Sequence, residues 1–432
     1  MGEPVLRGGG EAGSWIRKEV GWMVFSVSDD KTDGKRKGSR KSIKKKSLII
    51  IAEYNPFHNG HLYQMEKARK ETNADYTVVI LSGNFVQRGE PAILDEQTRA
   101  GLAVEAGADL VLRNPTAFAT ASADYFALGA VRVLKEIPGE LFLSFGSEEG
   151  RTTVMEEAAS LLGDKEEEYY SFIRERLSQG ISFPRAREEF LVRHIPGLKG
   201  LMQQPNNILG IEYIKHINRL VGGRCRIHTV LRKGAGYKDP APGNFMSATG
   251  VRRLILAGQK GWERAVPPWT QKALKHASLV APSMMMPYLR YLITREGESL
   301  SRYRDMVEGL ENRIVSSLQE EGSYEGLVTA VGTKRYTDAT IKRALLAAFL
   351  GLTKEEFGDM NGLNYPYIRI LGRTEKGNRL LAEIRRSSSV PFIHNENRYP
   401  WKKYYTKKTS LDLFRGLETK AENLYRMLSH EM

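Results

Sequence analysis

Two histidines three residues apart, His58 and His61, are the side chains of this sequence whose types and spacing point most directly to chemistry. They follow an apolar run at residues 47–51 that is typical of a buried strand, and they precede residues 62–68, whose apolar positions recur at helical spacing. A strand-to-helix turn gathers free backbone N–H groups and the positive end of the helix dipole, which favour a phosphate. Imidazoles there can donate to a phosphoryl oxygen as charge develops on it, and Gly60 lets a nucleotide approach the backbone. We interpret His58 and His61 as catalytic; the alternative is an ordinary turn with incidental histidines.

Two later segments offer a glycine and an amide to the same nucleotide. Gly146 ends a predicted strand and lets a ribose or adenine lie against bare backbone, although an ordinary turn glycine is the alternative. Asn207 stands near the start of a predicted helix and can hydrogen-bond a base or a phosphate. Its alternative role is to cap that helix, which is the commoner use of asparagine there.

Cations and hydroxyl groups can complete a triphosphate site. Arg232 and Lys233 follow a predicted strand and offer two positive charges to the β- and γ-phosphates, or they form a solvated surface pair. Ser247, Thr249 and Arg252 begin a predicted helix and are a candidate triphosphate clamp. The alternative for these three residues is a capped amphipathic helix.

The elements that must position these groups alternate between strand and helix. Strands are predicted at residues 47–51, 75–81, 108–112 and 140–145, and helices at 95–106, with Asp95 as N-cap and Gly107 as stop, and at 121–135. Alternation of this kind argues for a parallel sheet with right-handed crossovers, a Rossmann-like α/β domain. Ligands of such sheets bind at the carboxyl ends of the strands, where the histidine turn and Gly146 both fall.

The rest of the chain divides into a short strand near residues 226–231 and long helix-rich stretches. We expect a nucleotide-binding α/β domain at 47–265 and a mainly helical, basic domain at 266–432 that binds RNA. A single cysteine, Cys225, excludes a disulfide framework and a cysteine-based zinc site, and it fits a reducing cytoplasm. No apolar run approaches the roughly 20 residues that span a bilayer, so we expect a cytoplasmic protein without a membrane partner.

The net charge of +14 indicates a polyanionic partner, most commonly nucleic acid. Residues 1–46 carry twelve Lys/Arg against six Asp/Glu, and we expect this basic extension to be disordered and dispensable for the fold. The other eight excess positive charges belong to the remainder of the chain.

A segment near the C-terminus has the composition of an RNA-binding surface. Residues 398–408 interleave five cations with four aromatics, which suits phosphate contacts and stacking on unpaired bases. We expect Lys402, Lys403, Lys407 and Lys408 to bind the phosphates of an RNA partner. The alternative is a surface hairpin whose aromatic rings pack on the domain.

The stretch Asn-Pro-Phe-His-Asn-Gly-His at residues 55–61 resembles the HxGH signature of the nucleotidyltransferase superfamily, which includes class I aminoacyl-tRNA synthetases. Together with Ser-Gly-Asn-Phe-Val-Gln-Arg-Gly-Glu-Pro at 82–91, Ser-Phe-Gly-Ser-Glu at 144–148 and Pro-Asn-Asn-Ile-Leu-Gly-Ile-Glu-Tyr at 205–213, it resembles the bacterial tRNA(Met) cytidine acetate ligases. The likeness runs from about Ser47 into the C-terminal region. It implies activation of acetate by ATP, followed by acetylation of N4 of the wobble cytidine, position 34, of elongator tRNA(Met).

The resemblance also implies a set of site residues. Carried over position by position, the ATP site falls on Ile51, Ala52, Glu53, Tyr54, Asn55, Pro56, Phe57, His58, Asn59, Gly60, His61, Leu62, Tyr63, Gln64, Gly146, Asn207, Arg232 and Lys233. The family's hydroxyl-rich clamp appears here as Ser247-Ala-Thr-Gly-Val-Arg252, one hydroxyl short.

We expect Mg²⁺ to arrive with ATP and not to occupy a site built by the protein. Two rival functions stay open at this point. One is a small-molecule adenylyltransferase of the same superfamily, against which the long basic C-terminal region argues. The other is a non-catalytic RNA-binding or assembly factor with a nucleotide fold, against which the two histidines argue. The sequence leaves the oligomeric state open.

Overall fold

The computed structural model describes residues 45–148, 150, 152–200, 204–232, 245–395, 399 and 409–430. Residues 1–44 of the predicted basic extension lie outside this range, so the prediction of disorder stays a prediction. The end of the extension was placed one residue too late. Lys46 is the first residue of strand β1, because it has a pairing partner in Glu140, the first residue of the neighbouring strand β6.

The described residues form a seven-stranded sheet with strand order β7-β6-β1-β2-β5-β8-β9 and a two-stranded ribbon of β3 and β4. The strands are β1 (Lys46–Ala52), β2 (Tyr76–Ser82), β3 (Phe85–Val86), β4 (Glu90–Pro91), β5 (Leu110–Asn114), β6 (Glu140–Ser147), β7 (Cys225–Leu231), β8 (Ile368–Arg373) and β9 (Phe392–Ile393). Neighbouring strands of the large sheet are parallel except for β8, which is antiparallel to β5. The predicted Rossmann-like α/β class is confirmed.

The central strands are buried on both faces of the sheet. Ile49, Val78 and Ile80 pack into one apolar cluster, whereas the alternating residues Leu48 and Val79 pack into another. Side chains of a strand point alternately to the two faces, so a continuous run of Ile, Leu and Val supplies two cores at once. This is why residues 47–51 and 75–81 were recognisable as strands.

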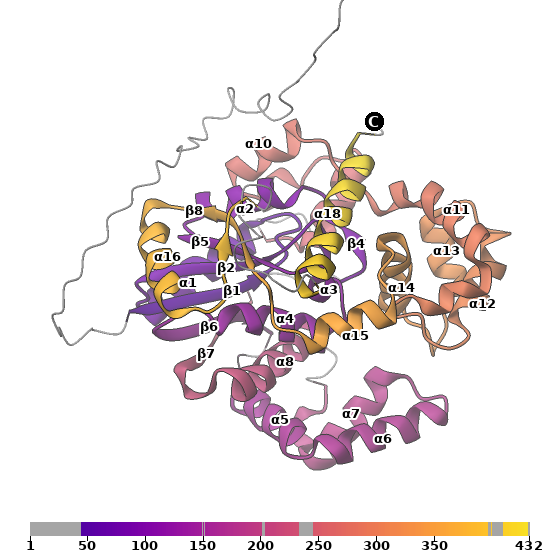
Figure 1. Cartoon of the computed structure of the whole chain (residues 1–432), viewed down its shortest axis with the longest axis horizontal. Helices are drawn as coiled ribbons and strands as arrows, with labels where there is room; N and C mark the ends of the chain where they lie inside the picture. The colour runs from indigo at the N-terminus through magenta and orange to yellow at the C-terminus, as the bar shows by residue number, and fades with distance from the viewer. Residues whose placement is uncertain are drawn as a thin grey trace, which may run out of the picture. The chain divides into compact units, whose positions relative to one another are not determined.

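Helices cover both faces of the sheet and continue beyond its edges (Figure 1). They are α1 (Asn59–Thr72), α2 (Glu96–Glu105), α3 (Thr116–Ala119), α4 (Ala123–Leu134), α5 (Thr152–Asp164), α6 (Glu166–Ser178), α7 (Phe183–His194), α8 (Pro205–Leu220), α9 (Ala248–Leu256), α10 (Pro268–His276), α11 (Met286–Glu296), α12 (Leu310–Leu318), α13 (Tyr324–Val331), α14 (Asp338–Leu350), α15 (Lys354–Gly362), α16 (Glu375–Ser387) and α18 (Thr409–Ser429). The predicted cap of α2 is confirmed, because the Asp95 carboxylate accepts a hydrogen bond from the Thr98 N–H at 2.9 Å.

The helix-rich C-terminal part also contributes to the sheet. Strands β8 and β9, which were not predicted, extend the sheet beyond β5. Helix α18 packs on α3, and the Glu418 carboxylate accepts hydrogen bonds from the backbone N–H and the hydroxyl of Thr116. One apolar cluster includes residues from both predicted domains. The boundary at residues 265 and 266 stays a prediction, but the sheet is not confined to residues 47–265.

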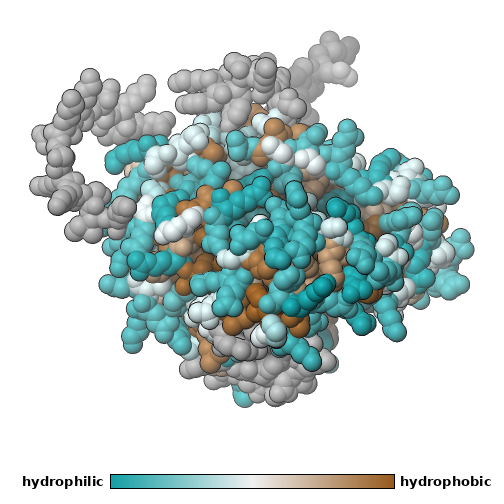
Figure 2. All heavy atoms as spheres, turned by 90° about the horizontal axis from the view of Figure 1, so that it is seen from below, coloured by the Kyte–Doolittle hydropathy of each residue, from teal (hydrophilic) through white to brown (hydrophobic). Residues whose placement is uncertain are grey.

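The face of the molecule shown in Figure 2 is mainly hydrophilic, with apolar residues distributed between polar ones. Among the helices of the described residues, none has the length and apolarity that crossing a bilayer requires.

Candidate nucleotide and catalytic site

The strand order places the predicted site residues at one point of the sheet. After β1 the chain builds β2 and β5 on one side, and then it returns to add β6 and β7 on the other side of β1. In open α/β sheets, ligands bind at such a reversal, outside the carboxyl ends of the strands. His58 and His61 follow β1, Gly146 lies at the end of β6, and Arg232 follows β7.

His58 and His61 cap helix α1 through their imidazole rings. Nδ1 of His58 accepts from the Gly60 N–H at 3.0 Å, and Nδ1 of His61 accepts from the His58 N–H at 3.3 Å. This is a capping box in which histidines stand where Ser or Thr and Glu are usual. A backbone N–H can only donate, so in both neutral rings the proton belongs on Nε2. Each histidine thus carries its N–H donor on Nε2, the ring nitrogen that the cap does not use.

The electrostatics keep both rings neutral. Burial, assisted by the Arg232 guanidinium, lowers the pKa of His58 to about 3. Burial and the neighbouring His58 and Arg232 hold the pKa of His61 well below its usual value. The two rings stack with centroids 3.6 Å apart, an arrangement that would be costly if both were charged. A pair of neutral donors can stabilise charge on a phosphoryl oxygen without a proton leaving the enzyme.

Gly60 and two aromatic rings fix the positions of the histidines. A Cβ at Gly60 would lie 2.9 Å from Cε1 of His58, so this glycine makes room for the imidazole ring. The Tyr54 and Phe57 rings lie 4.9 and 5.6 Å from the ring of His61. Both aromatic residues are buried, and they form one wall of the turn.

Arg99 holds the carboxyl ends of β1 and β2 together, and sequence reasoning missed it. Its fully buried guanidinium donates to the carbonyl oxygens of Glu53 at 2.6 Å and Ser82 at 3.0 Å, and also to that of Gly83. A charge buried without a carboxylate partner is stable only when carbonyl groups surround it, and here they do. The sequence signal is an arginine at a buried position of α2, next to Ala100 and three residues after the buried Glu96.

The β3–β4 hairpin supports the segment that precedes the histidines. The Gln87 N–H donates to the Glu53 carboxylate at 2.8 Å, and burial raises the pKa of Glu53. Arg252 donates to the Asn55 carbonyl at 2.6 Å and lies 3.6 Å from the Glu90 carboxylate. Of the predicted triphosphate clamp, Arg252 is therefore directed at the histidine turn and the hairpin.

The other two members of that clamp lie at the start of α9. Ser247 caps this helix by accepting from the Gly250 N–H at 3.1 Å, and Thr249 is exposed. The cap is the alternative that the sequence offered for Ser247.

Gly146 and Arg232 lie against one another at the ends of neighbouring strands. A Cβ at Gly146 would be 3.3 Å from Cγ of Arg232, so the absence of a side chain lets the arginine lie across the strand end. The Arg232 guanidinium is 3.6 Å from the Glu148 carboxylate, and 46% of its side chain is exposed. A half-exposed guanidinium with one carboxylate partner among the described residues keeps N–H groups available for a phosphate.

Asn207 is fully buried at the start of α8. Its Oδ1 accepts from the Ser147 hydroxyl at 3.1 Å, which links the helix to the end of β6. The alternative role as helix cap is wrong, because the N-cap position of α8 belongs to Gln204 and Asn207 lies inside the helix. The adjacent Asn206 donates to Glu148 at 2.6 Å.

Several of the remaining predicted ATP residues serve as structural contacts around this centre. Asn59 donates to the Arg264 carbonyl at 2.8 Å, and Gln64 donates to the Ser144 carbonyl at 3.2 Å. Ile51 packs on one face of the sheet, and Ala52, Leu62 and Tyr63 pack on the other, whereas Pro56 is buried in the turn itself. Lys233 and the four tail lysines, Lys402, Lys403, Lys407 and Lys408, lie outside the described residues.

One cluster in the described part of the chain has the composition of a metal site but not its chemistry. Carboxylate oxygens of Asp124 and Glu212 and a ring nitrogen of His216 lie within 4.8 Å of one another. The Lys215 ammonium lies 2.6 Å from Asp124 and 2.7 Å from Glu212, where a metal ion would otherwise stand. The cluster is therefore an ion-pair network that joins α4 to α8.

Comparison with known proteins gives a consistent assignment. The family profile described as HIGH Nucleotidyl Transferase matches residues 45–432. A tRNA(Met) cytidine acetate ligase of Thermoanaerobacter sp. (strain X514) is 38% identical over 376 residues, covering 85% of this chain and 93% of the relative. A protein of the same name from Thermotoga maritima is 35% identical and covers 87% of this chain and 94% of the relative.

Solved structures agree with the sequence relatives. The crystal structure of Thermotoga maritima TmcAL bound with alpha-thio ATP superposes with a TM-score of 0.81 at 32% identity, covering 89% of this chain and 94% of that chain. An apo form of the same protein gives a TM-score of 0.80 at 34% identity, with 89% and 95% covered. The chain therefore belongs to the HIGH nucleotidyl transferase family and, within it, to the tRNA(Met) cytidine acetate ligases, and it is an enzyme of the ligase class.

Proposed function

We propose that this protein uses ATP to activate acetate and then acetylates N4 of the wobble cytidine of elongator tRNA(Met). The observation that carries the proposal is the pair of neutral histidines whose Nδ1 atoms are held by backbone N–H groups at the carboxyl end of β1. The names of the relatives, and the ATP analogue bound by one of them, support the choice of substrates.

The first step is attack of an acetate oxygen on the α-phosphorus of ATP. The new P–O bond gives acetyl-adenylate, the bond to the β-phosphate breaks, and pyrophosphate leaves. The Nε2–H groups of His58 and His61 donate to the α-phosphoryl oxygen as negative charge builds on it. Arg232, half exposed beside Gly146, is suited to hold the phosphates that leave. Mg²⁺ enters with ATP and neutralises phosphate charge.

In the second step the N4 amine of the cytidine attacks the acetyl carbon of the mixed anhydride. A C–N bond forms, the C–O bond to AMP breaks, N4 releases a proton, and AMP leaves. The cytidine must be unstacked before N4 can reach the adenylate, as in other enzymes that act on a base. Since ATP, acetate and tRNA meet in the cytoplasm, we place the reaction there.

The test is a reconstituted reaction. The full chain, ATP, acetate and a tRNA(Met) transcript are incubated, pyrophosphate is quantified, and the digested tRNA is examined by mass spectrometry for N4-acetylcytidine. We expect acetate-dependent pyrophosphate release and one acetylated cytidine per tRNA. Release that requires another small substrate in place of acetate, with unmodified tRNA, would favour a small-molecule adenylyltransferase. Absence of any release would favour a non-catalytic role.

A further inference from the structure

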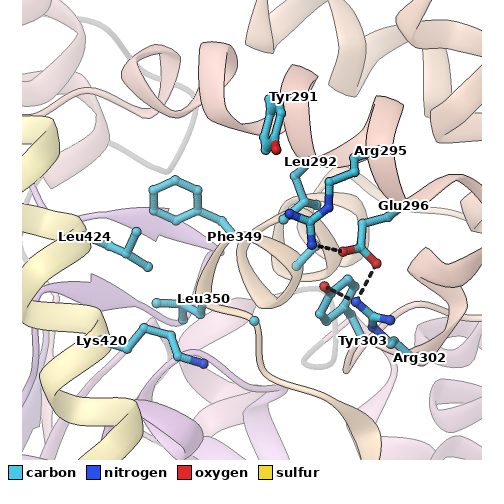
Figure 3. A pocket seen from close by; sticks show the side chains of 12 residues that line it. Tyr291, Leu292, Arg295, Glu296, Arg302, Tyr303, Phe349, Leu350, Lys420 and Leu424 are labelled. Atoms are coloured by element: carbon cyan, nitrogen blue, oxygen red, sulfur yellow. Dashed lines mark hydrogen bonds and ion pairs between the residues drawn. The ribbon is translucent and has the colours of Figure 1, made fainter.

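A surface cavity of about 270 Å³ lies on the helical part of the chain, away from the histidine turn in sequence. Residues of α11, of the 3₁₀ turn Gly297–Arg302, of α14 and of α18 line it (Figure 3). This volume is close to that of the smallest ligand pockets, roughly 300 Å³. It suits one small ligand, or one residue or nucleotide of a larger partner, and it is too small for a helix.

The cavity is rimmed by cations. Arg295 and Arg302 lie on one side, and Lys420 reaches toward the cavity from α18 on the opposite side (Figure 3). The carboxylate of Glu296, only 7% exposed, pairs with both guanidinium groups. Three cations against one carboxylate leave a net of two positive charges at the rim. Arg302 also donates to the Tyr303 hydroxyl at 3.0 Å. The two arginine side chains are 64% and 51% exposed, so part of each guanidinium group is accessible to solvent.

Lys420 is positioned by the end of a helix. A Cβ at Gly351, the left-handed C-cap of α14, would be 3.2 Å from the lysine Nζ. Across the described residues, Lys420 forms no ion pair with a carboxylate of the chain. Its ammonium group is therefore available to an external anion.

An exposed aromatic ring stands beside these cations. Tyr291 is 66% exposed, the highest value among the large apolar side chains in the described part of the chain. The Arg295 guanidinium lies 5.9 Å from the Tyr291 ring centroid, one helical turn along α11. Phe349 and Leu424 supply an apolar wall (Figure 3). A solvent-exposed ring beside cations that outnumber their carboxylate partner offers a π-face together with a site for a phosphate.

We propose that this cavity binds one unpaired nucleotide of the RNA substrate, with its base on Tyr291 and its phosphate between Arg295 and Lys420. The proposal rests on the proposed function for the existence of an RNA substrate, but it concerns a surface separate from the catalytic centre. The cavity holds the RNA while the target cytidine is presented to the histidine turn. RNA is favoured over an acidic peptide because stacking on the exposed ring needs an aromatic ligand.

The test compares three single variants of the full chain, Tyr291→Ala, Arg295→Ala and Lys420→Ala, with a matched control. Tyr170 and Arg174 on α6 repeat the same exposed Tyr-x-x-x-Arg spacing, so Tyr170→Ala and Arg174→Ala control for surface charge and ring loss. Binding of a fluorescent tRNA(Met) transcript is followed by anisotropy at several salt concentrations. Thermal unfolding of each variant is recorded, and all five side chains are exposed enough for the fold to persist.

We expect Tyr291→Ala to weaken tRNA binding by on the order of tenfold, with little change in salt dependence. Arg295→Ala and Lys420→Ala should each weaken binding and lower the salt slope by about one unit. The α6 variants should bind as the unsubstituted chain does. Pyrophosphate release from ATP and acetate should be unchanged in all five.

The outcomes separate this proposal from the proposed function. If all three cavity variants kept the tRNA affinity and salt slope of the unsubstituted chain and still formed N4-acetylcytidine, the proposed role of the cavity would be wrong. The proposed acetylation of tRNA(Met) would be unaffected. If the unsubstituted chain made no N4-acetylcytidine but the cavity variants bound RNA more weakly, the role of the cavity in RNA binding would be supported. The proposed acetylation reaction would be wrong. If polyglutamate displaced the fluorescent tRNA but a single-stranded RNA oligonucleotide did not, the cavity would be assigned to an acidic peptide. That result would overturn the proposal.

Discussion

The imidazole rings of His58 and His61 stack 3.6 Å apart, and the backbone N–H of His58 donates to Nδ1 of His61. The same two residues therefore cap a helix and present two Nε2–H donors to the carboxyl edge of the sheet. The capping role and the chemical role can be separated by substitution, because a cap needs an acceptor at short reach whereas phosphoryl stabilisation needs a donor farther out.

Substitution of His58 should separate the two roles. His58→Asn retains a good N-cap but removes the Nε2–H donor, so we expect near-normal thermal stability and adenylate formation lower by on the order of 10²-fold. His58→Ala should show the same catalytic loss together with about 1 kcal/mol less stability from the missing cap. Acetate-dependent pyrophosphate release and thermal unfolding are measured on both. Full activity in His58→Asn would remove this donor from the mechanism.

His61→Ala should likewise lower adenylate formation by on the order of 10²-fold, because it removes the second donor. His228→Ala is the matched control, since His228 lies on β7 with Nδ1 3.1 Å from the Ser144 hydroxyl and outside the histidine turn. The two variants are compared in the same pyrophosphate assay. Equal rates in both would contradict the assignment of His61.

The pH dependence should reveal that the histidines work in their neutral form. Burial lowers the pKa of His58 to about 3 and holds the pKa of His61 well below its usual value. We therefore expect no inflection from either residue in pyrophosphate release between about pH 5.5 and 8.5, a range that brackets the ordinary histidine pKa. An ascending limb near the ordinary pKa that disappears in His58→Asn would show that a histidine titrates in the folded enzyme.

The same pKa shifts predict a stability effect of definite sign. An unfolded histidine has a pKa of about 6.5, so below that pH the unfolded chain binds more protons than the folded chain. The contribution of His58 to stability is complete above the unfolded pKa and is lost as the pH falls toward the folded value of about 3. The thermal midpoint of the unsubstituted chain should thus fall more between about pH 7 and pH 4.5 than that of His58→Asn. Parallel curves for the two proteins would contradict the lowered pKa.

Gly60 should be sensitive to a single methyl group. The Cβ of Gly60→Ala would lie 2.9 Å from Cε1 of His58, so the imidazole ring that we propose to be catalytic must move. Displacements of about 1 Å can cost on the order of 10²-fold in rate, and we expect a loss approaching that size with the fold retained. Gly163→Ala in α5, where nothing lies within 4 Å, is the control and should be fully active.

Features of the fold that depend on residues close together in the sequence were predictable, whereas features that depend on distant residues were not. The strands at residues 47–51 and 75–81 and the cap at Asp95 were predictable because burial runs and caps are local signals. The meeting of the histidine turn with Gly146 followed from a rule about parallel sheets. Strand β8 was not predictable, because its antiparallel pairing with β5 joins segments far apart in sequence. The contacts of Arg99 and Arg252 were missed for the same reason.

ATP binding should depend on Arg232. Its guanidinium can grip phosphate oxygens through two parallel bonds, and it lies across Gly146 with nearly half of its side chain exposed. Arg232→Ala should weaken ATP binding by on the order of tenfold or more, and Arg232→Lys should recover only part of that loss. Arg226→Ala is the control, because Arg226 lies on β7, the strand that Arg232 follows, and its side chain is 70% exposed. Lys233→Ala should weaken ATP binding less than Arg232→Ala does. If neither variant changed the ATP affinity, the two residues would be ordinary solvent-exposed charges with no role in ATP binding.

The last prediction concerns the four tail lysines, Lys402, Lys403, Lys407 and Lys408. Their segment interleaves cations with aromatics, a composition suited to phosphates and unpaired bases. Changing all four to Gln should weaken tRNA binding and flatten its salt dependence by roughly one unit for each phosphate that the variant no longer binds. Acetate-dependent pyrophosphate release should be nearly untouched, because we propose that ATP and acetate react at the histidine turn. As a control, Lys272→Gln and Lys275→Gln remove two exposed cations from α10. A quadruple variant with the affinity and salt slope of the unsubstituted chain would exclude this segment from the RNA surface.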